Sequence, residues 1–111
     1  MQKEKEIENS ILDYLAHIPN SKFWKNQSGG IFDSKRQCFR KSFNKFHING
    51  VSDILGIMGG RFICIEVKSP KGRLSPNQKV FLGEITSLGG LAFMARSIDD
   101  VKEMFRKEGL L

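Results

Sequence analysis

Two adjacent glycines, Gly59 and Gly60, constrain the fold of this chain more than any other feature. They separate two runs, Val51 to Met58 and Arg61 to Ser69, that are rich in β-branched, aromatic and other apolar residues. A Gly-Gly pair supplies the positive φ angles that a two-residue hairpin loop requires. The sequence therefore predicts two antiparallel strands that turn at these glycines.

Two carboxylates and a lysine lie where this hairpin brings its open ends together. Asp53 is near the start of the first strand and Glu66 near the end of the second, so they are roughly opposite each other. Because strand side chains alternate, Glu66 and Lys68 share one face while Val67 points to the other. Carboxylates this close favour a cation, and oxygen ligands of this kind suit Mg²⁺ or Mn²⁺. This is the minimum equipment for metal-assisted phosphodiester cleavage.

The alternative interpretation is an ordinary ion pair between Glu66 and Lys68 on a surface strand. The neighbouring Ile63 and Ile65 indicate a buried strand instead, and Val67 continues the apolar pattern. The ion-pair interpretation is weakened accordingly.

Longer motifs surround these residues and, with an acidic amphipathic first helix, span nearly the whole chain. They are Gly50-Val51-Ser52-Asp53-Ile54, Ile65-Glu66-Val67-Lys68 and Leu74-Ser75-Pro76-Asn77-Gln78. Together they resemble the VRR-NUC group of the PD-(D/E)xK nuclease superfamily, whose small stand-alone members come from phages and bacteria. Ser52 departs from the pattern, because it stands where the superfamily often has proline; that position carries no ligand.

The resemblance implies a role for each residue of the hairpin. Asp53 and Glu66 would be metal ligands, and the carbonyl of Val67 would be a further ligand. Lys68 would be the catalytic lysine, and the ion would be Mg²⁺ or Mn²⁺.

Relatives also use an acid of the first helix and a glutamine that follows the hairpin. Glu4 is our first choice for the helical acid and Glu8, one turn later, is the reserve; both also fit a solvated acidic face near a helix N-terminus. Gln78 stands where relatives place a glutamine next to the metal or phosphate. It also completes a capping box with Ser75, so both interpretations remain open.

Basic residues are concentrated in one segment that precedes the hairpin. The chain has a net charge of +6, and residues 22–45 hold seven basic residues and one acid, Asp33. Segregated positive charge indicates contact with nucleic-acid phosphates, with solubility as the alternative explanation. We expect DNA contacts from this segment and from a basic turn after the hairpin, at Lys25, Lys35, Arg36, Arg40, Lys41, Lys45, Lys71 and Arg73.

Four phenylalanines, Phe32, Phe39, Phe43 and Phe46, interleave with these charges. Their rings would either stack on unpaired bases or pin the segment onto the core. We favour the second interpretation, because several rings left in water would form a sticky surface.

The remaining pattern predicts an α/β fold with a mixed sheet flanked by helices, in the order α-β-β-β-α-β-α of the PD-(D/E)xK restriction-endonuclease-like core. Apolar spacing gives a first helix that stops by Pro19 and a last helix that follows Ser97. A right-handed crossover makes the last strand, Leu91 to Arg96, parallel to the strand that begins at Arg61. The other expected elements are a strand at 21–27, some structure in the basic segment, and a helix from Pro76 that buries Phe81, Ile85 and Leu88 before Gly89-Gly90.

Length and composition set outer bounds. The 111 residues predict a single domain, residues 1–111, in a reduced cytoplasmic setting, since Cys38 and Cys64 are too few for a disulfide framework. The sequence has no transmembrane run and no nucleotide-binding phosphate loop. His47-Ile48-Asn49 superficially resembles an HNH nuclease motif, but no second histidine follows it.

These observations predict a divalent-metal-dependent DNA endonuclease. By resemblance we expect a homodimer, for which branched or four-way junction DNA would be an attractive substrate. The alternatives are a non-catalytic DNA-binding module with the same fold, and a subunit whose activity requires a partner protein.

Overall fold

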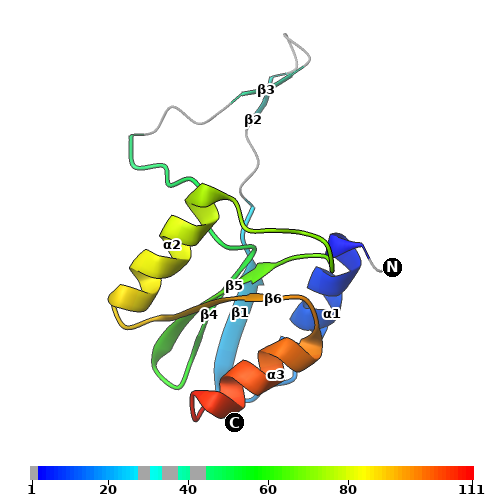
Figure 1. The fold of residues 1–111 in the computed structure, drawn as a ribbon, viewed down its shortest axis with the longest axis vertical. Helices are drawn as coiled ribbons and strands as arrows, with labels where there is room; N and C mark the ends of the chain where they lie inside the picture. The colour runs from blue at the N-terminus through cyan, green and yellow to red at the C-terminus, as the bar shows by residue number, and fades with distance from the viewer. Residues whose placement is uncertain (1–2, 28–30, 34–37, 41–44) are drawn as a thin grey trace.

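The described part of the chain forms a four-stranded mixed sheet with helices on both faces (Figure 1). The computed structural model describes residues 3–27, 31–33, 38–40 and 45–111, and the side chains of 3–27 and 45–111. The elements are α1 (Glu4–Leu15), β1 (Ser21–Lys25), β2 (Ile31–Asp33), β3 (Cys38–Arg40), β4 (Ile54–Met58), β5 (Arg61–Val67), α2 (Pro76–Ser87), β6 (Leu91–Ala95) and α3 (Ile98–Lys107). The main sheet has the order β1-β4-β5-β6. The predicted α/β class is confirmed, and the order of α1, α2, α3 and the four strands of the main sheet is the predicted α-β-β-β-α-β-α, with β2 and β3 inserted as a separate sheet.

The hairpin predicted at Gly59-Gly60 joins β4 to β5. Met58 pairs with Arg61, so the loop contains only the two glycines. Their φ angles are +60° and +74°, the left-handed conformation of a type I′ turn. At the open end Ile54 pairs with Ile65, so the residues that follow in register bring Asp53 beside Glu66.

The crossover through α2 makes β6 parallel to β5, as predicted. α2 begins with the complete capping box expected from the sequence, in which Ser75 is the N-cap and Gln78 the reciprocal partner. The prediction that Leu88 is buried is wrong: its side chain is 83% exposed. The helix ends at Ser87, and because Leu88 is the C-cap it leaves the buried stripe, where Leu82 packs instead.

α1 and α3 pack against the opposite face of the sheet. α1 ends at Leu15, a full turn before Pro19. Phe105 of α3 is fully buried, and its ring lies 6.3 Å from that of Phe23 on β1 and 6.2 Å from that of Phe93 on β6. These contacts join α3 to both edge strands of the sheet, β1 and β6.

α2 covers only part of its own side of the sheet. Side-chain alternation and the registers place Trp24, Ile57 and Phe62 on the same side as Cys64, which packs under α2. Cys64 is fully buried, whereas the other three are 41%, 50% and 37% exposed. We call Trp24, Ile57 and Phe62 the open apolar face.

The basic segment contains a two-stranded ribbon inserted between β1 and β4. β2 and β3 pair antiparallel, with Ile31 opposite Arg40 and Asp33 opposite Cys38. Figure 1 shows the ribbon extending away from the main sheet. The expectation that this segment contains structure is therefore confirmed for the residues described.

Candidate active site

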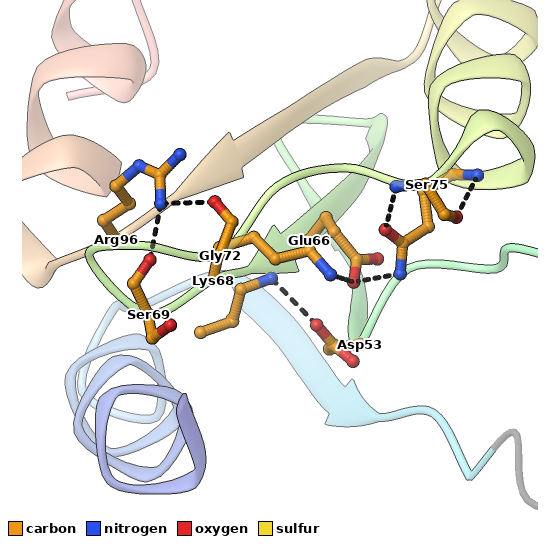
Figure 2. A network of polar contacts seen from close by, with 9 residues as sticks. Asp53, Glu66, Lys68, Ser69, Gly72, Ser75 and Arg96 are labelled. Carbon is orange, nitrogen blue, oxygen red and sulfur yellow. Dashed lines mark hydrogen bonds and ion pairs between the residues drawn. The ribbon is translucent and has the colours of Figure 1, made fainter. Parts of the chain in front are cut away.

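Asp53 fixes the end of the hairpin through both its backbone and its side chain. Its carbonyl accepts a hydrogen bond from the Asn26 amide at 2.8 Å, which joins it to the chain leaving β1. Its carboxylate accepts the Val67 amide, also at 2.8 Å, which joins it to the end of β5 (Figure 2). The carboxylate predicted to face Glu66 is thus held by neighbouring backbone.

Glu66 is a buried carboxylate, with only 1% of its surface exposed. Its Oε1 contacts Lys68 Nζ at 3.8 Å, while its buried Oε2 has no hydrogen-bond partner. Burial raises the pKa of Glu66 to about 8, assisted by the nearby Asp53 carboxylate and opposed by Lys68. The hydrogen bonds and the ion pair of the folded chain therefore stabilise a charged Glu66 carboxylate only in part.

Gln78 caps α2 and also contacts Glu66. Its Oε1 accepts the Ser75 amide at 2.8 Å, which closes the capping box. Its Nε2 donates to Glu66 Oε1 at 3.0 Å, so the first turn of α2 is connected to the carboxylate pair. One side chain therefore caps the helix and contacts the site at the same time; a catalytic role for it stays a prediction.

The two acids of α1 differ in environment. Glu4 is exposed in the first turn, whereas Glu8 is 7% exposed and one of its oxygens, Oε1, is buried without a hydrogen-bond partner. Burial raises the pKa of Glu8, while Lys25, whose Nζ is 3.6 Å from the other carboxylate oxygen, lowers it. Asp53 raises the pKa of Glu8 further, so α1 places Glu8 within electrostatic range of Asp53, while Glu4 is within electrostatic range of Glu66.

The predicted DNA contacts are only partly visible. Lys71 and Arg73 are exposed in the loop between β5 and α2, and Lys45 is exposed. Lys35, Arg36 and Lys41 lie outside the described residues, and only the backbone of Arg40 is described. The DNA-binding role of these residues therefore stays a prediction.

The prediction that the phenylalanines pack onto the core is wrong for Phe46, which is 77% exposed. Phe46 lies in a turn that follows the basic segment, outside the helices and strands. Phe43 and the side chains of Phe32 and Phe39 lie outside the described residues.

A cavity of about 340 Å³ opens beside the carboxylates. Its lining includes Asp53, Glu66, Gln78 and a segment that the sequence analysis set aside, represented by His47 and Asn49. The sequence did contain one indication that these residues line the site: they directly precede the Gly50-to-Ile54 motif that carries Asp53.

Arg96 is a further residue near the site that no sequence pattern indicated. It follows β6, and its guanidinium donates hydrogen bonds to the carbonyls of Ser69 and Gly72, the latter at 2.8 Å (Figure 2). Arg96 therefore holds the loop that leaves Lys68. No motif marks this contact, since it joins residues 24 and 27 positions apart.

The side chains at the hairpin end fit a partial divalent-metal site. Within the described ranges, no group of three or more His, Cys, Asp or Glu side chains has metal-ligand spacing. Mg²⁺ nevertheless needs only one or two carboxylates, because it keeps several waters. Asp53 and Glu66 provide such a pair, and the unpartnered Glu66 Oε2 is an oxygen that a cation would satisfy.

The mixed α/β sheet, with two carboxylates and a lysine at the open end of its central hairpin, is consistent with a nuclease-type domain. The model of the VRR-NUC domain matches residues 4–99, and the chain belongs to the VRR-NUC family. A solved structure described as a VRR_NUC domain protein is similar with a TM-score of 0.66 and 16% identity, covering 95% of this chain and 86% of that chain. No curated protein matched the chain. No helix in the described part of the chain is long and apolar enough to cross a membrane.

Proposed function

We propose that this chain is a divalent-metal-dependent endonuclease that hydrolyses phosphodiester bonds in DNA. The observation that supports this most directly is the buried Glu66, which meets Asp53, Lys68 and Gln78 while one of its oxygens has no partner. A carboxylate in that environment is costly for a folded protein unless a cation joins it. The VRR-NUC family and its nuclease-type fold support the same conclusion.

The ligands proposed are Asp53, Glu66 and the Val67 carbonyl, with Mg²⁺ or Mn²⁺ as the ion. When bound, the ion supplies Lewis-acid polarisation of the phosphate and a lowered pKa for a coordinated water. Lys68 orients the attacking water or neutralises charge that develops on the phosphorus. The Gln78 amide holds Glu66 in place, and its bond to the Ser75 amide fixes its own orientation.

For the acid from α1 we propose Glu8 in preference to Glu4. Glu8 is buried and within electrostatic range of Asp53, and one of its oxygens lacks a partner. Glu8→Gln should therefore reduce cleavage and metal affinity more than Glu4→Gln. Equal losses in the two variants would contradict this preference.

The direct test is a cleavage panel of linear, nicked, flapped and four-way DNA with Mg²⁺ or Mn²⁺. Lys68→Ala should abolish cutting, whereas Lys107→Ala, at an exposed lysine in the last turn of α3, should leave it intact. If the pure chain cuts no substrate, or if Lys68→Ala cuts as well as the parent, the proposal is wrong.

Metal titration separates the two alternative functions. A non-catalytic DNA-binding module would show no metal affinity that depends on Asp53 and Glu66. A partner-dependent subunit would bind metal through these carboxylates but would cut nothing in isolation. Calorimetric titration of the parent and Asp53→Asn with Mn²⁺ distinguishes them.

We further propose that the chain acts as a homodimer on branched DNA. The open apolar face supports this, because water-exposed Trp24, Ile57 and Phe62 are unusual side chains to find together on the surface of a monomer. Two copies would carry two sites, which suits substrates with more than one strand to cut.

A further inference from the structure

We propose that the segment Phe46–Asn49 binds an unpaired nucleotide next to the scissile phosphate by stacking against its base. This inference rests on the proposed nuclease function and adds a substrate-contacting surface to it. The segment meets the carboxylates at the cavity of about 340 Å³, which is lined by His47, Ile48 and Asn49 as well as by Asp53 and Glu66. A strand held at the carboxylates therefore has this segment beside it.

The chemistry of the segment suits a nucleobase. Ile48 lines the cavity yet is 59% exposed, and the adjacent Phe46 is 77% exposed. Lys45 Nζ lies over the Phe46 ring, 5.1 Å from its centroid, which combines a cation with this apolar surface. Apolar or aromatic surface beside a basic group is the combination on which single-stranded nucleic acid binds, with bases on the rings and phosphates on the cations.

The polar members of the segment fit the rest of a nucleotide. The imidazole of His47 and the amide of Asn49 can donate hydrogen bonds to phosphate oxygens or to a base edge. The cavity volume is at the lower end of the range for small-ligand sites, which suits one nucleotide better than a longer ligand. Stacking on a side chain needs a base face that duplex stacking covers, so the bound nucleotide is unpaired or splayed.

Gly50 fixes this surface relative to the catalytic groups. Its φ is +79°, and a Cβ at this position would lie 2.5 Å from the backbone carbon and oxygen of Asn77. Only glycine allows so close an approach to the first turn of α2. The segment is thereby anchored against the turn that carries Gln78, which contacts Glu66.

The test is a scan of abasic positions across a fluorescent DNA with a single-strand to double-strand junction. Binding is measured by anisotropy in EDTA, so that nothing is cut, and the cut bond is mapped separately with Mn²⁺. The parent should bind roughly tenfold more weakly when one position next to the cut bond lacks its base. Phe46→Ala and Ile48→Ala should bind intact DNA weakly and lose the sensitivity to that position.

Leu88→Ala is the matched control, because Leu88 is an exposed apolar residue at the opposite end of α2. It should retain the parent's abasic profile, and circular dichroism should show that all variants are folded. The inference is overturned if no position is sensitive, or if the variants lose the same factor on intact and abasic DNA. Absence of cleavage in Mn²⁺ would instead defeat the proposed function, while a position-specific coupling in EDTA would leave the base contact standing.

Discussion

At the scale of single residues, Glu66 combines burial with incomplete compensation. Lys68 and Gln78 both approach Oε1, whereas Oε2 is buried without a hydrogen-bond partner. Asp53 adds a second carboxylate nearby and raises the pKa of Glu66 further. The metal-free chain therefore holds the Glu66 proton more tightly when folded than when unfolded.

Stability without metal should consequently fall as the pH rises. Because the folded pKa of Glu66 is raised above its ordinary value of 4.5, the favourable contribution is present at low pH and is lost as the pH approaches about 8. In EDTA, the free energy of unfolding should drop by on the order of 2 kcal/mol between pH 5.5 and 8.5. Urea denaturation at both pH values measures this drop.

A neutral side chain at position 66 should remove most of this dependence. Glu66→Gln should flatten the curve and be more stable than the parent at pH 8.5, whereas Glu84→Gln, at an exposed position of α2, should follow the parent. Parallel curves for the parent and Glu66→Gln would show that another group controls the stability.

Like Glu66 and Glu8, Ser52 has a buried polar atom without a hydrogen-bond partner. It is 0% exposed, and its hydroxyl has no hydrogen-bond partner. Ser52→Ala removes that hydroxyl with little change in volume, so it should raise the free energy of unfolding by about 1 kcal/mol. Thermal or urea unfolding at pH 6 checks this, and a destabilised variant would mean that the hydroxyl has a partner in solution.

At the scale of elements, the loop from Ser69 to Leu74 joins the strand that carries Glu66 to the helix that carries Gln78. Arg96 ties this loop to the end of β6 through the carbonyls of Ser69 and Gly72. The backbone amide of Arg96 in turn donates to the carboxylate of Asp100, in the first turn of α3. The Ala95 carbonyl at the end of β6 also accepts the Lys68 amide at 3.0 Å, so β6 directly and α3 through Arg96 help to fix the position of Lys68.

Removal of the Arg96 hydrogen bonds to the loop from Ser69 to Leu74 should impair cleavage more than DNA binding. Arg96→Ala should lower the cleavage rate at saturating DNA roughly tenfold, because small displacements of catalytic groups are costly. Arg96→Lys should recover part of the rate, since one ammonium can still reach a carbonyl. Anisotropy should give a nearly unchanged affinity for DNA; an equal loss of affinity and rate would indicate general unfolding instead.

At the scale of the whole molecule, the features that could be predicted depend on local register. Gly59-Gly60 fixes which residues face each other across the hairpin, so the meeting of Asp53 with Glu66 followed from the sequence. Contacts between distant segments could not be predicted in this way. Arg96 is an example, because its partners in the loop are 24 and 27 residues away. The burial of Leu88 could not be predicted either. A shift of one residue in the end of α2 decides whether Leu88 lies in the last helical turn or is the C-cap.

The open apolar face is also a property of the whole molecule, since it arises where α2 stops covering the sheet. Ile57 is at its centre, opposite both Phe62 and Lys22 in the strand registers. Association of two copies through this face would bury Trp24, Ile57 and Phe62 together. A lysine at position 57 would leave a buried charge in that interface but would remain hydrated in a monomer.

Ile57→Lys should therefore convert the proposed dimer to a monomer without unfolding it. Light scattering across a concentration series should give twice the 12.6 kDa chain mass for the parent and a single chain mass for the variant. Leu111→Lys, at another exposed apolar residue, should behave as the parent. A monomeric parent in the presence of Mg²⁺ and DNA would remove the dimer proposal, and a dimeric Ile57→Lys would place the interface elsewhere. If dimerisation aligns two sites on a four-way junction, Ile57→Lys should still nick flapped DNA but should lose paired cutting of the junction.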